Sequence, residues 1–483
     1  MKLRSTAVST AILLAAMACS KKEVPAPAAV LPVPSAAQLE WHEMETNAFV
    51  HFTTNTFTGL EWGYGNEKES IFNPTNLDAD QWVTTLKEAG FKTIILTCKH
   101  HDGFCLWPTQ YTEHSIKNSP YKDGKGDIVK EVSEACKRHG VKFGIYLSPW
   151  DRNRADYGKP EYITYYRNQL KELFTSYGPV FEMWFDGANG GDGFYGGANE
   201  KRTIDRKTYY DWPTTLNMVR EMEPNVILFS DAGPGVRWGG NENGTAGKTN
   251  WNTITPDTLH AGKAGIENLL NTGAEGGTHW IPAEIDVSIR PGWFYHDKED
   301  SLVKSPERLF EIYLTSVGRG STLLLNVPPD KRGLINDLDI AALKGWKAMI
   351  DNEFKTNLAA NVPTTASSFR GESEQYGAAK ATDGDKETYW STDDAVTTGS
   401  LDINLGGVKP VKYVVIQEYI KLGQRVKSFT IEVWKDNAWT KVAEETTVGY
   451  KRIVKLDNVS TDKVRVSITG SRACPVISNV AVY

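Results

Sequence analysis

Two patterns of apolar spacing alternate through residues 41–355. In the first, apolar residues recur every three or four positions and the run closes on a glycine, as in DADQWVTTLKEAG at 78–90, which is typical of an amphipathic helix. In the second, a short apolar run lies between polar residues, as in FKTIILTCKHH at 91–101, which predicts a strand buried on both faces. The two patterns predict helices at 78–90, 126–140, 162–178, 211–225 and 305–318, and strands at 47–52, 91–101, 141–149, 179–188, 226–233 and 321–329.

The alternation of helix and strand indicates an α/β fold with parallel strands, because such strands need helical crossovers. Repetition of this unit through about 310 residues favours a (β/α)8-like barrel over 39–356. The alternative is a doubly wound sheet, which usually carries a glycine-rich turn after its first strand, and NAFVHFTTNTF at 47–57 has none. In a barrel the chemistry lies at the C-terminal ends of the strands, where the sequence places His51, His100, His101, Trp150, Asp186 and Asp231.

The helical pattern stops after about residue 356. Short alternating segments separated by turns follow, and they predict an antiparallel β-sandwich domain over 357–483. The segments are SLDINLG, VKYVVIQEYI, SFTIEVWK, RIVKLD, KVRVSITG and VISNVAVY.

The N-terminal residues predict export. A basic start precedes an apolar run too short to span a membrane, so residues 1–19 are interpreted as a lipoprotein-type signal peptide with Cys19 as the lipidated residue. Cleavage by an ordinary signal peptidase is the alternative, because Ala16 stands where such signals usually have leucine. Residues 20–38 are rich in Pro and Ala and predict an extended, disordered tether. We expect a protein that faces the periplasm and meets the membrane only through this anchor, with the cell surface as the alternative.

The amino-acid composition argues against nucleic acid as a partner and favours a carbohydrate ligand. The formal net charge is −6 and no basic stripe occurs, which argues against nucleic acid. The chain has 15 Trp and 20 Tyr, many of them beside Gly, Asp or His in turn-like segments, where aromatic faces suit sugar rings. The cysteines after Cys19 lack zinc spacing, and no disulfide is predicted, with a Cys98–Cys105 pair as the alternative.

Three histidines stand at predicted strand ends: His51 in FVHF, and His100 and His101 in KHHDGF. A metal centre would need a spacing such as HxH or HExxH, and neither occurs, so no metal is predicted in the active site. One interpretation is structural, with hydrogen-bonded histidines capping loops. The other is recognition of sugar hydroxyls, because a neutral imidazole both donates and accepts hydrogen bonds.

Two further stretches combine acids with aromatic residues. FSDAGPGVRWGGNENGTAG at 229–247 is interpreted as a long functional loop that carries Asp231, Arg237, Trp238 and Glu242. PAEIDVSIRPGWFYH at 282–296 is predicted to be a dense polar and aromatic cluster for the rest of an oligosaccharide, formed by Glu284, Asp286, Arg290, Trp293, Tyr295 and His296.

The chemistry that these residues fit is glycoside hydrolysis, which needs two carboxyl groups in different protonation states. Asp186 in MWFDGANG suits a nucleophile, because a short side chain on a rigid strand has little freedom to lose. Glu242 suits an acid/base, because a longer side chain on a loop reaches the leaving oxygen. From the residues alone, Asp231 remains a rival to Glu242.

Taken together, the motifs resemble family 29 glycoside hydrolases, the α-L-fucosidases. They are FVHF, EWGYG, KHHDGF, GIYLSPWDR, MWFDGANG, SDAGPGVRWGGNENG and SIRPGWFYH, in that order along about residues 40–355. The resemblance implies a retaining exo-α-L-fucosidase with Asp186 as nucleophile and Glu242, not Asp231, as acid/base. The RWxGNExG pattern resembles the subfamily that acts on α-1,3/1,4-linked fucose in branched, Lewis-type oligosaccharides, and no cofactor is implied for catalysis.

The same resemblance implies a set of substrate-binding residues, and it leaves one segment without a counterpart. The insertion GGDGFYGGANEKRTID after Asp186 departs from the family pattern and leaves subsites on the leaving-group side in doubt. The implied residues are His51, His100, His101, Glu61, Trp62, Trp184, Tyr146, Trp150, Arg237, Trp238, Asp286 and Trp293.

The C-terminal segment AAKATDGDKETYWST resembles the discoidin, or factor V/VIII C-type, β-sandwich. Many such domains hold a structural calcium, and Asp383 and Asp385 match the calcium loop, whereas a glutamate usual near the C-terminus is absent. A structural role for this domain is favoured over glycan binding. The competing hypothesis for the whole chain is a non-catalytic glycan-binding lipoprotein with a fucosidase-like barrel.

Overall fold

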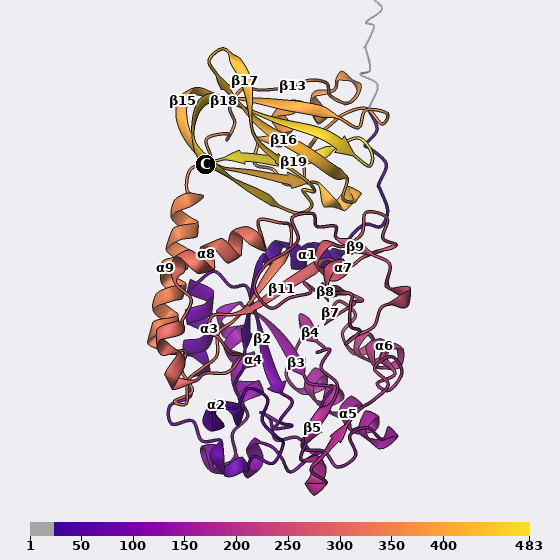
Figure 1. Ribbon diagram of the computed structural model, residues 1–483, viewed down its shortest axis with the longest axis vertical. Helices are drawn as coiled ribbons and strands as arrows, with labels where there is room; N and C mark the ends of the chain where they lie inside the picture. Colours follow the sequence, from indigo (N-terminus) through magenta and orange to yellow (C-terminus); the bar gives the residue numbers. More distant parts are fainter. Residues whose placement is uncertain (1–23) are drawn as a thin grey trace, which may run out of the picture.

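The computed structural model describes residues 24–483, so the predicted signal peptide and Cys19 lie outside the described residues. Eight parallel strands close into a barrel in the order β1-β12-β11-β8-β7-β4-β3-β2, which confirms the predicted (β/α)8-like domain (Figure 1). The barrel strands are β1 (Thr46–Val50), β2 (Thr93–Lys99), β3 (Lys142–Leu147), β4 (Glu182–Trp184), β7 (Ile227–Ser230), β8 (Val236–Trp238), β11 (Ala283–Ser288) and β12 (Thr322–Asn326).

Helices surround the barrel, and most begin at a side-chain cap that the sequence supplies. Asp78 accepts the N–H of Gln81 at the start of α3, and Asp127 accepts that of Lys130 at the start of α4, which satisfies donors that a helix N-terminus leaves free. The helices are α1 (Ala36–Met44), α2 (Asn55–Thr58), α3 (Ala79–Glu88), α4 (Ile128–His139), α5 (Pro160–Ser176), α6 (Trp212–Met222), α7 (Glu267–Thr272), α8 (Pro306–Thr315) and α9 (Asp337–Glu353).

Two barrel strands, β8 and β11, are missing from the strands that the sequence predicts, and β8 lies in a stretch interpreted as a loop. Within 229–247 the chain forms β8, which pairs with β7 on one side and β11 on the other. No helix separates β7 from β8 in the described chain. A strand of three residues is too short to show alternation, so its pattern is hidden among the surrounding glycines.

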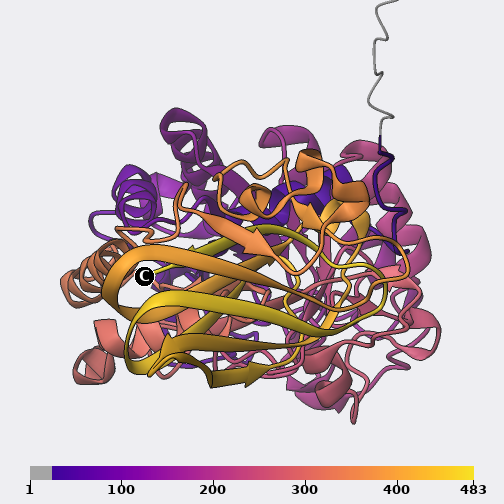
Figure 2. The same cartoon turned by 90° about the horizontal axis from the view of Figure 1, so that it is seen from above.

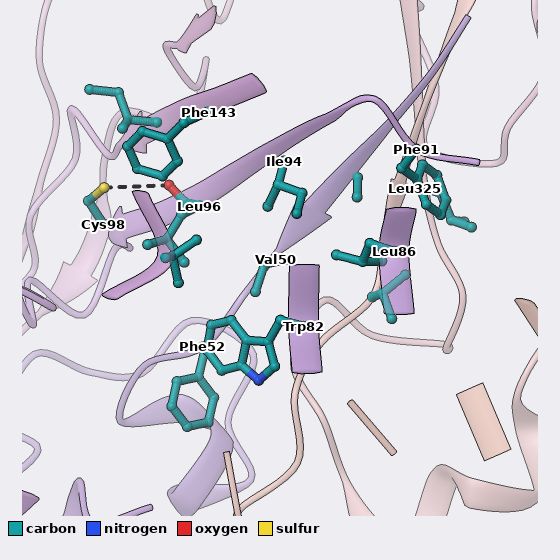
Figure 3. Packing of buried hydrophobic residues seen from close by; sticks show 14 of the residues in the cluster. Val50, Phe52, Trp82, Leu86, Phe91, Ile94, Leu96, Cys98, Phe143 and Leu325 are labelled. Carbon is teal, nitrogen blue, oxygen red and sulfur yellow. Dashed lines mark hydrogen bonds between the residues drawn. The ribbon is translucent and has the colours of Figure 1, made fainter. Parts of the chain in front are cut away.

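Alternate residues of each barrel strand face opposite ways. Side chains directed outward, among them Val50 of β1 and Leu96 of β2, pack against the helices together with Trp82 and Leu86 of α3 (Figure 3). Side chains directed into the barrel form a separate buried cluster, which includes Phe49, Ile95, Tyr146, Trp184, Phe229 and Leu324. The inward residues therefore stack in layers from the closed end of the barrel to its mouth.

The C-terminal domain is a β-sandwich with its own apolar core, as predicted. Figures 1 and 2 show it lying across the end of the barrel where α1 is found, whereas α2 and β5 (Gly191–Gly193) lie at the other end. Its strands are β13 (Thr364–Ala366), β14 (Trp390–Ser391), β15 (Gly399–Glu418), β16 (Val426–Lys435), β17 (Ala438–Glu445), β18 (Arg452–Ser471) and β19 (Val476–Val482).

Residues 24–35 correct the prediction of a disordered tether over 20–38. They are extended but lie against the sandwich, and α1 begins at Ala36, inside the predicted tether. Proline and alanine give no local order of their own, and the partners come from residues more than 300 positions away. The bonds run from Tyr376 Oη to Val24 O (3.2 Å), Arg370 Nε to Pro25 O (2.7 Å), Arg425 to Ala28 O (2.6 Å) and Val30 N to Leu422 O (2.9 Å).

The loop predicted to hold calcium is closed by hydrogen bonds. Asp383 accepts the hydroxyl of Thr388 at 2.9 Å and the N–H of Asp385, and Asp385 accepts the N–H of Glu387. Within residues 24–483, no group of three or more His, Cys, Asp or Glu residues is placed to hold a metal. Calcium binding at this loop stays a prediction.

Two further expectations concern the cysteines and membrane contact. Cys98, Cys105, Cys136 and Cys474 are buried free thiols, in agreement with the absence of a predicted disulfide. Among the described residues, no helix combines the length and apolar character needed to cross a membrane.

Candidate active site

A cavity of about 230 Å³ opens at the C-terminal ends of the barrel strands. Side chains from β1, β3, β4 and β11 point into it from within the barrel, and loops that follow the strands complete its rim. It is lined by Phe49, His51, Trp62, His100, His101, Tyr146, Trp184, Asp186, Gly187, Ala188, Asp231, Trp238, Glu242, Asp286 and Trp293. Most of the predicted site residues are therefore brought together.

Asp186 lies at the end of β4, fixed by donors on both oxygens. Tyr146 donates its hydroxyl to Oδ2 at 2.8 Å, and the backbone N–H of Ala188 donates to Oδ1 at 2.7 Å. His101 Nε2 is 3.7 Å from Oδ2, and the carboxyl remains 24% exposed to the cavity. A carboxylate held in one orientation and open to one side is suited to attack a bound electrophile.

The hydrogen-bond network assigns the tautomer of His101. Ser148 uses its only hydroxyl proton on Trp150 O at 2.6 Å, so His101 Nδ1, 2.7 Å from Ser148 Oγ, must be the donor of that pair. The Nε2 atom of the neutral ring is then an acceptor beside Asp186. Burial lowers the pKa of His101 to about 4, which keeps the ring neutral near pH 7.

His51 is oriented by the same logic. The Asn326 amide donates to Trp293 O at 2.8 Å and to Ser288 Oγ at 2.9 Å, so its oxygen accepts from His51 Nδ1 at 2.8 Å. Burial lowers the pKa of His51 to about 3, and that of His100 falls well below its ordinary value for the same reason. The imidazoles thus meet the cavity as neutral groups, with acceptor nitrogens suited to hydroxyl donors.

Three more carboxyl groups surround Asp186, and burial raises the pKa of each. For Glu242 the negative charge of Asp186 adds to the effect of burial. Burial and the charge of Glu242 raise the pKa of Asp286 well above its usual range, while its Oδ1 accepts the indole N–H of Trp238 at 2.9 Å. The pKa of Asp231 is raised to about 6. The cavity therefore favours protonated carboxyls around Asp186, the separation of states that acid–base chemistry needs.

Asp231 lines the cavity and also fixes the loops that form its wall beside Asp186. Its Oδ2 accepts the N–H of Gly262 at 2.7 Å, and a side chain at Gly187 would come within 2.1 Å of that atom. Glycine is required at 187 because the carboxyl of Asp231 fills the space. The acid is thus tied to the loops beside Asp186.

Aromatic rings form the floor and the rim. Trp184 stacks on Phe229 with ring centroids 3.8 Å apart, and Phe49 packs against it at 5.1 Å. Trp62 stands at the rim with 51% of its surface exposed. Together with Trp238 and Trp293, these rings present flat apolar faces beside the polar groups, an arrangement suited to a sugar.

Three predicted substrate-binding residues lie outside the cavity lining. Glu61 accepts the N–H of Trp293 at 2.8 Å and contacts His296 Nε2 at 2.8 Å, so it fixes the loop that carries Trp293. Trp150 is buried and packs against Trp62. Its indole N–H donates at 2.9 Å to Oη of Tyr195, a residue of the insertion after Asp186. The insertion forms the hairpin β5 (Gly191–Gly193) and β6 (Glu200–Arg202).

Arg237 is the third of these residues. It is fully buried on the outer side of β8 and donates to the carbonyls of Leu270 at 2.7 Å and Trp251 at 2.9 Å. A strand alternates its faces, so Trp238 points inward and its neighbour outward. The loop interpretation of 229–247 concealed this difference.

The structure also disperses the predicted cluster at 282–296. Only Asp286 and Trp293 line the cavity. Glu284 lies deeper in the barrel, where it accepts the indole N–H of Trp184 at 3.0 Å. Arg290 is buried against Asp339, 2.9 Å away, so it stabilises the packing of the barrel instead of meeting a ligand.

Sequence reasoning missed Phe49 and the orienting residues Ser148 and Asn326. Phe49 lies on β1 two positions before His51, which directly follows the strand, so continued alternation places both on the inner face. Asn326 ends β12, a position where barrel chemistry is expected. The polar partners of His51 and His101 are Asn326 on β12 and Ser148 directly after β3, and these pairings are visible only in three dimensions.

A parallel barrel whose mouth combines several carboxyls, neutral imidazoles and tryptophan faces defines the class of glycoside hydrolases. Residues 28–350 match the family model for α-L-fucosidases, and residues 363–479 match that for F5/8 type C domains. The chain belongs to the α-L-fucosidase family, glycoside hydrolase family 29, and carries an F5/8 type C domain at its C-terminal end.

Similar proteins span almost the whole chain. α-L-Fucosidase 1 of Arabidopsis thaliana is 41% identical over 465 residues, which cover 95% of this chain and 89% of the plant protein. The structure of a glycoside hydrolase 29 family member from an unknown rumen bacterium has a TM-score of 0.84 at 43% identity and covers 95% of this chain and 78% of that one. A family 29 fucosidase of Ruminococcus gnavus, determined in complex with fucose, has a TM-score of 0.86 at 34% identity and covers 96% of this chain and 97% of that one.

Proposed function

We propose that this α-L-fucosidase is a retaining exo-enzyme that removes terminal α-1,3/1,4-linked L-fucose from branched, Lewis-type oligosaccharides. The observation that carries the proposal is the pairing of Asp186, held by Tyr146 and the Ala188 N–H, with Glu242 across one cavity. The solved R. gnavus relative holds fucose, which supports fucose as the sugar that this cavity takes.

In the first step, an oxygen of Asp186 attacks the anomeric carbon of fucose. The bond from that carbon to the glycosidic oxygen breaks, and Glu242 gives its proton to the departing oxygen. The negative charge of Asp186 and the burial of Glu242 favour the protonated acid at this stage, since both raise its pKa. A covalent fucosyl-enzyme ester and a free oligosaccharide result.

In the second step, Glu242 takes a proton from a water molecule, and that oxygen attacks the anomeric carbon. The ester bond to Asp186 breaks, fucose leaves with its original configuration, and Glu242 is protonated again. The ring nitrogens of His51, His100 and His101 accept hydrogen bonds from fucose hydroxyl groups, and the aromatic walls pack on the sugar. The Trp62 and Trp238 side takes the rest of the oligosaccharide.

The test combines stereochemistry with a substrate panel. Proton NMR of the first product formed should show α-L-fucose, and hydrolysis of α-1,2-, 1,3-, 1,4- and 1,6-fucosylated oligosaccharides should favour the 1,3 and 1,4 linkages. Initial formation of β-L-fucose would overturn the double displacement. Equal rates on all four linkages would overturn the specificity alone.

We further propose that the chain is exported and anchored through Cys19, facing the periplasm. Residue 24 lies against the sandwich, which covers the end of the barrel opposite α2 and β5. An anchor before residue 24 would leave the cavity facing away from the membrane. Radiolabelled palmitate incorporated into the wild-type chain, but not into Cys19→Ala, would test this localisation, and equal labelling of both would exclude the anchor.

A further inference from the structure

The loop that carries Glu242 has little structure of its own. It joins β8 to β9 (Thr253–Ile254), and residues 239–252 form no helix or strand. Four of its residues are glycines, which leave the backbone free in the unfolded chain. Near Glu242 the loop is held by Asn271, whose amide donates to Gly239 O at 2.7 Å and to Thr245 O at 2.9 Å. The rest of the loop must be fixed from elsewhere.

The far arm of the loop is fixed by the C-terminal sandwich. Gln424, only 1% exposed, accepts the N–H of Asn252 at 2.8 Å and donates to Asn250 O at 2.9 Å. Its amide therefore pairs with the loop backbone as a neighbouring strand would. The hydroxyl of Thr447 accepts the N–H of Asn250 at 2.8 Å. Buried backbone groups of the barrel domain are thus satisfied by side chains of the other domain.

A second route connects the sandwich to residues closer to Glu242. Ile453, at the start of β18, donates its N–H to Gly318 O at 2.9 Å, so the sandwich adds to the turn after α8. The next residue of that turn, Arg319, donates to Ala246 O at 2.7 Å. Arg452 of β18 also donates to Lys248 O at 2.7 Å. Two carbonyls within six residues of Glu242 are therefore held by arginines at the domain boundary.

Arg237 of β8 holds the same loop from the barrel side. Among residues 24–483 its guanidinium has no carboxylate within hydrogen-bonding distance, and its donors go to oxygens of Leu270, Ile281, Asn250 and Trp251. Two of these belong to the arm that the sandwich holds. The arm is therefore clamped between β8, whose next residue Trp238 lines the cavity, and the C-terminal domain.

We infer that the C-terminal sandwich is a positioning element for Glu242, with Gln424 as its central contact and Arg237 as the partner on the barrel. This inference rests on the proposed role of Glu242 as acid/base. The sandwich acts through the loop backbone and not by touching substrate. A shift of about 1 Å in a catalytic group costs on the order of 10²-fold in rate, so a glycine-rich loop needs such anchors.

The readout must separate proton transfer from other losses. A fucosylated trisaccharide has a leaving group that needs the proton of Glu242, whereas α-L-fucosyl fluoride does not. In Gln424→Ala we expect kcat/KM to fall about 10- to 100-fold on the trisaccharide and less than about 3-fold on the fluoride. Arg237→Lys, which keeps the charge but loses the forked donor geometry, should show the same asymmetry.

Lys412→Ala is the matched control. It removes an exposed ion pair between the sandwich and Glu353 of α9, away from the loop, and should leave both substrates unaffected. If Gln424→Ala fails to fold, Thr447→Val provides the milder test with the same expected asymmetry. Equal losses on both substrates, or a lower Tm with unchanged kinetics, would overturn the inference.

Glu242→Gln distinguishes a failure of the inference about the sandwich from a failure of the proposed function. If it shows the asymmetry and the Gln424 and Arg237 variants do not, the sandwich does not position the acid and the proposed function stands. If Glu242→Gln loses activity equally on both substrates, the assignment of the acid/base fails, and the inference about the sandwich fails with it.

Discussion

The interior of the barrel holds two layers of acidic residues that behave differently. The upper layer, Asp186 and Asp286 at the mouth, borders the cavity. The lower layer consists of Glu182 on β4, four residues before Asp186, and Glu284 on β11, two residues before Asp286, and both are fully buried. Strand alternation carries both layers on one face, and the indole of Trp184 separates them.

The lower layer is a sealed polar core. Glu284 accepts N–H groups from Trp184 at 3.0 Å and Asn47 at 3.4 Å, and burial raises its pKa to about 7. Burial and the neighbouring Glu284 raise the pKa of Glu182 well above its ordinary value. A side chain at Gly144 would meet the backbone oxygen of Glu182 at 3.0 Å and Ile95 at 2.8 Å, so glycine there makes room for the backbone of β4 and for Ile95.

The comparison teaches that a buried carboxyl with a raised pKa does not by itself mark a catalytic site. What distinguishes the two layers is access to the cavity. The upper layer borders open space, and hydrogen-bond donors hold Asp186 in one orientation, whereas the lower layer is surrounded by protein. Changes in the upper layer should therefore alter catalysis with little effect on stability. Changes in the lower layer should alter stability first, and catalysis only through Trp184.

The largest expected effect is on the upper layer. Asp186→Asn keeps the shape of the side chain but removes the nucleophilic charge, so kcat on a fucosylated trisaccharide should fall by at least about 10³-fold. The thermal midpoint should change by less than about 2 °C, because the group is partly exposed and isosteric. Near-normal turnover in a clean preparation would remove Asp186 from its proposed role.

The lower layer gives the next largest effect. Glu284→Leu leaves the Trp184 indole and the Asn47 amide without their acceptor, and should cost about 2–4 kcal/mol in free energy of unfolding, measured with urea. Glu284→Gln is the matched variant, because its amide oxygen still accepts from Trp184, and it should cost under about 1 kcal/mol. Equal losses in both variants would mean that packing, not hydrogen bonding, holds this layer.

Acid should destabilise the protein through His51 and His101, which line the cavity beside the upper layer. In the folded state the pKa of His51 is about 3 and that of His101 about 4, against 6.5 as the ordinary value, so the unfolded chain binds more protons below pH 6.5. Stability from these groups is complete above pH 6.5 and is lost as pH falls toward 3–4. At pH 5 each should cost about 2 kcal/mol. Carboxyls with a raised pKa, such as Glu284, act in the opposite sense over this range, so the measured quantity is the difference between wild type and His51→Gln, which cannot gain charge, in urea unfolding at pH 7 and pH 5. The fall in stability from pH 7 to pH 5 should be smaller in His51→Gln.

The smallest expected effect concerns the rim. Trp62 is half exposed, so Trp62→Ala should leave stability unchanged and raise KM about 3- to 10-fold, through the loss of an apolar face for the sugar. Trp62→Phe keeps a face and should recover most of that loss. A fall in kcat with constant KM would instead place the indole among groups that act in the transition state.

Much of the fold followed from local patterns. The helix at 78–90 and the strand at 91–101 were predicted from periodicity and appear as α3 and β2. β8 was missed because three residues carry no periodic pattern. The order of residues 24–35 was missed because their partners, such as Arg370 and Arg425, lie in another domain.

The candidate site also contains residues that local sequence patterns identified and residues that only the structure placed. Asp186, Glu242 and the three histidines were found because each stands at a strand end or in a motif. Arg237 and Glu61 lie outside the cavity lining, because a sequence does not tell which way a side chain turns: one points outward from β8, and the other turns to the 293–296 loop.

By itself, the sequence determined the α/β character of the first domain, the β character of the second, most of the barrel strands, and which residue types stand at their ends. Those properties depend on spacing along the chain, which a single sequence records. Only the tertiary structure decided that Ser148 and Asn326 set the histidine tautomers, that Trp184 seals one acidic layer from another, and that Gln424 reaches the loop of Glu242. Each of these depends on groups brought together from distant positions, and their geometry exists only after the chain has folded.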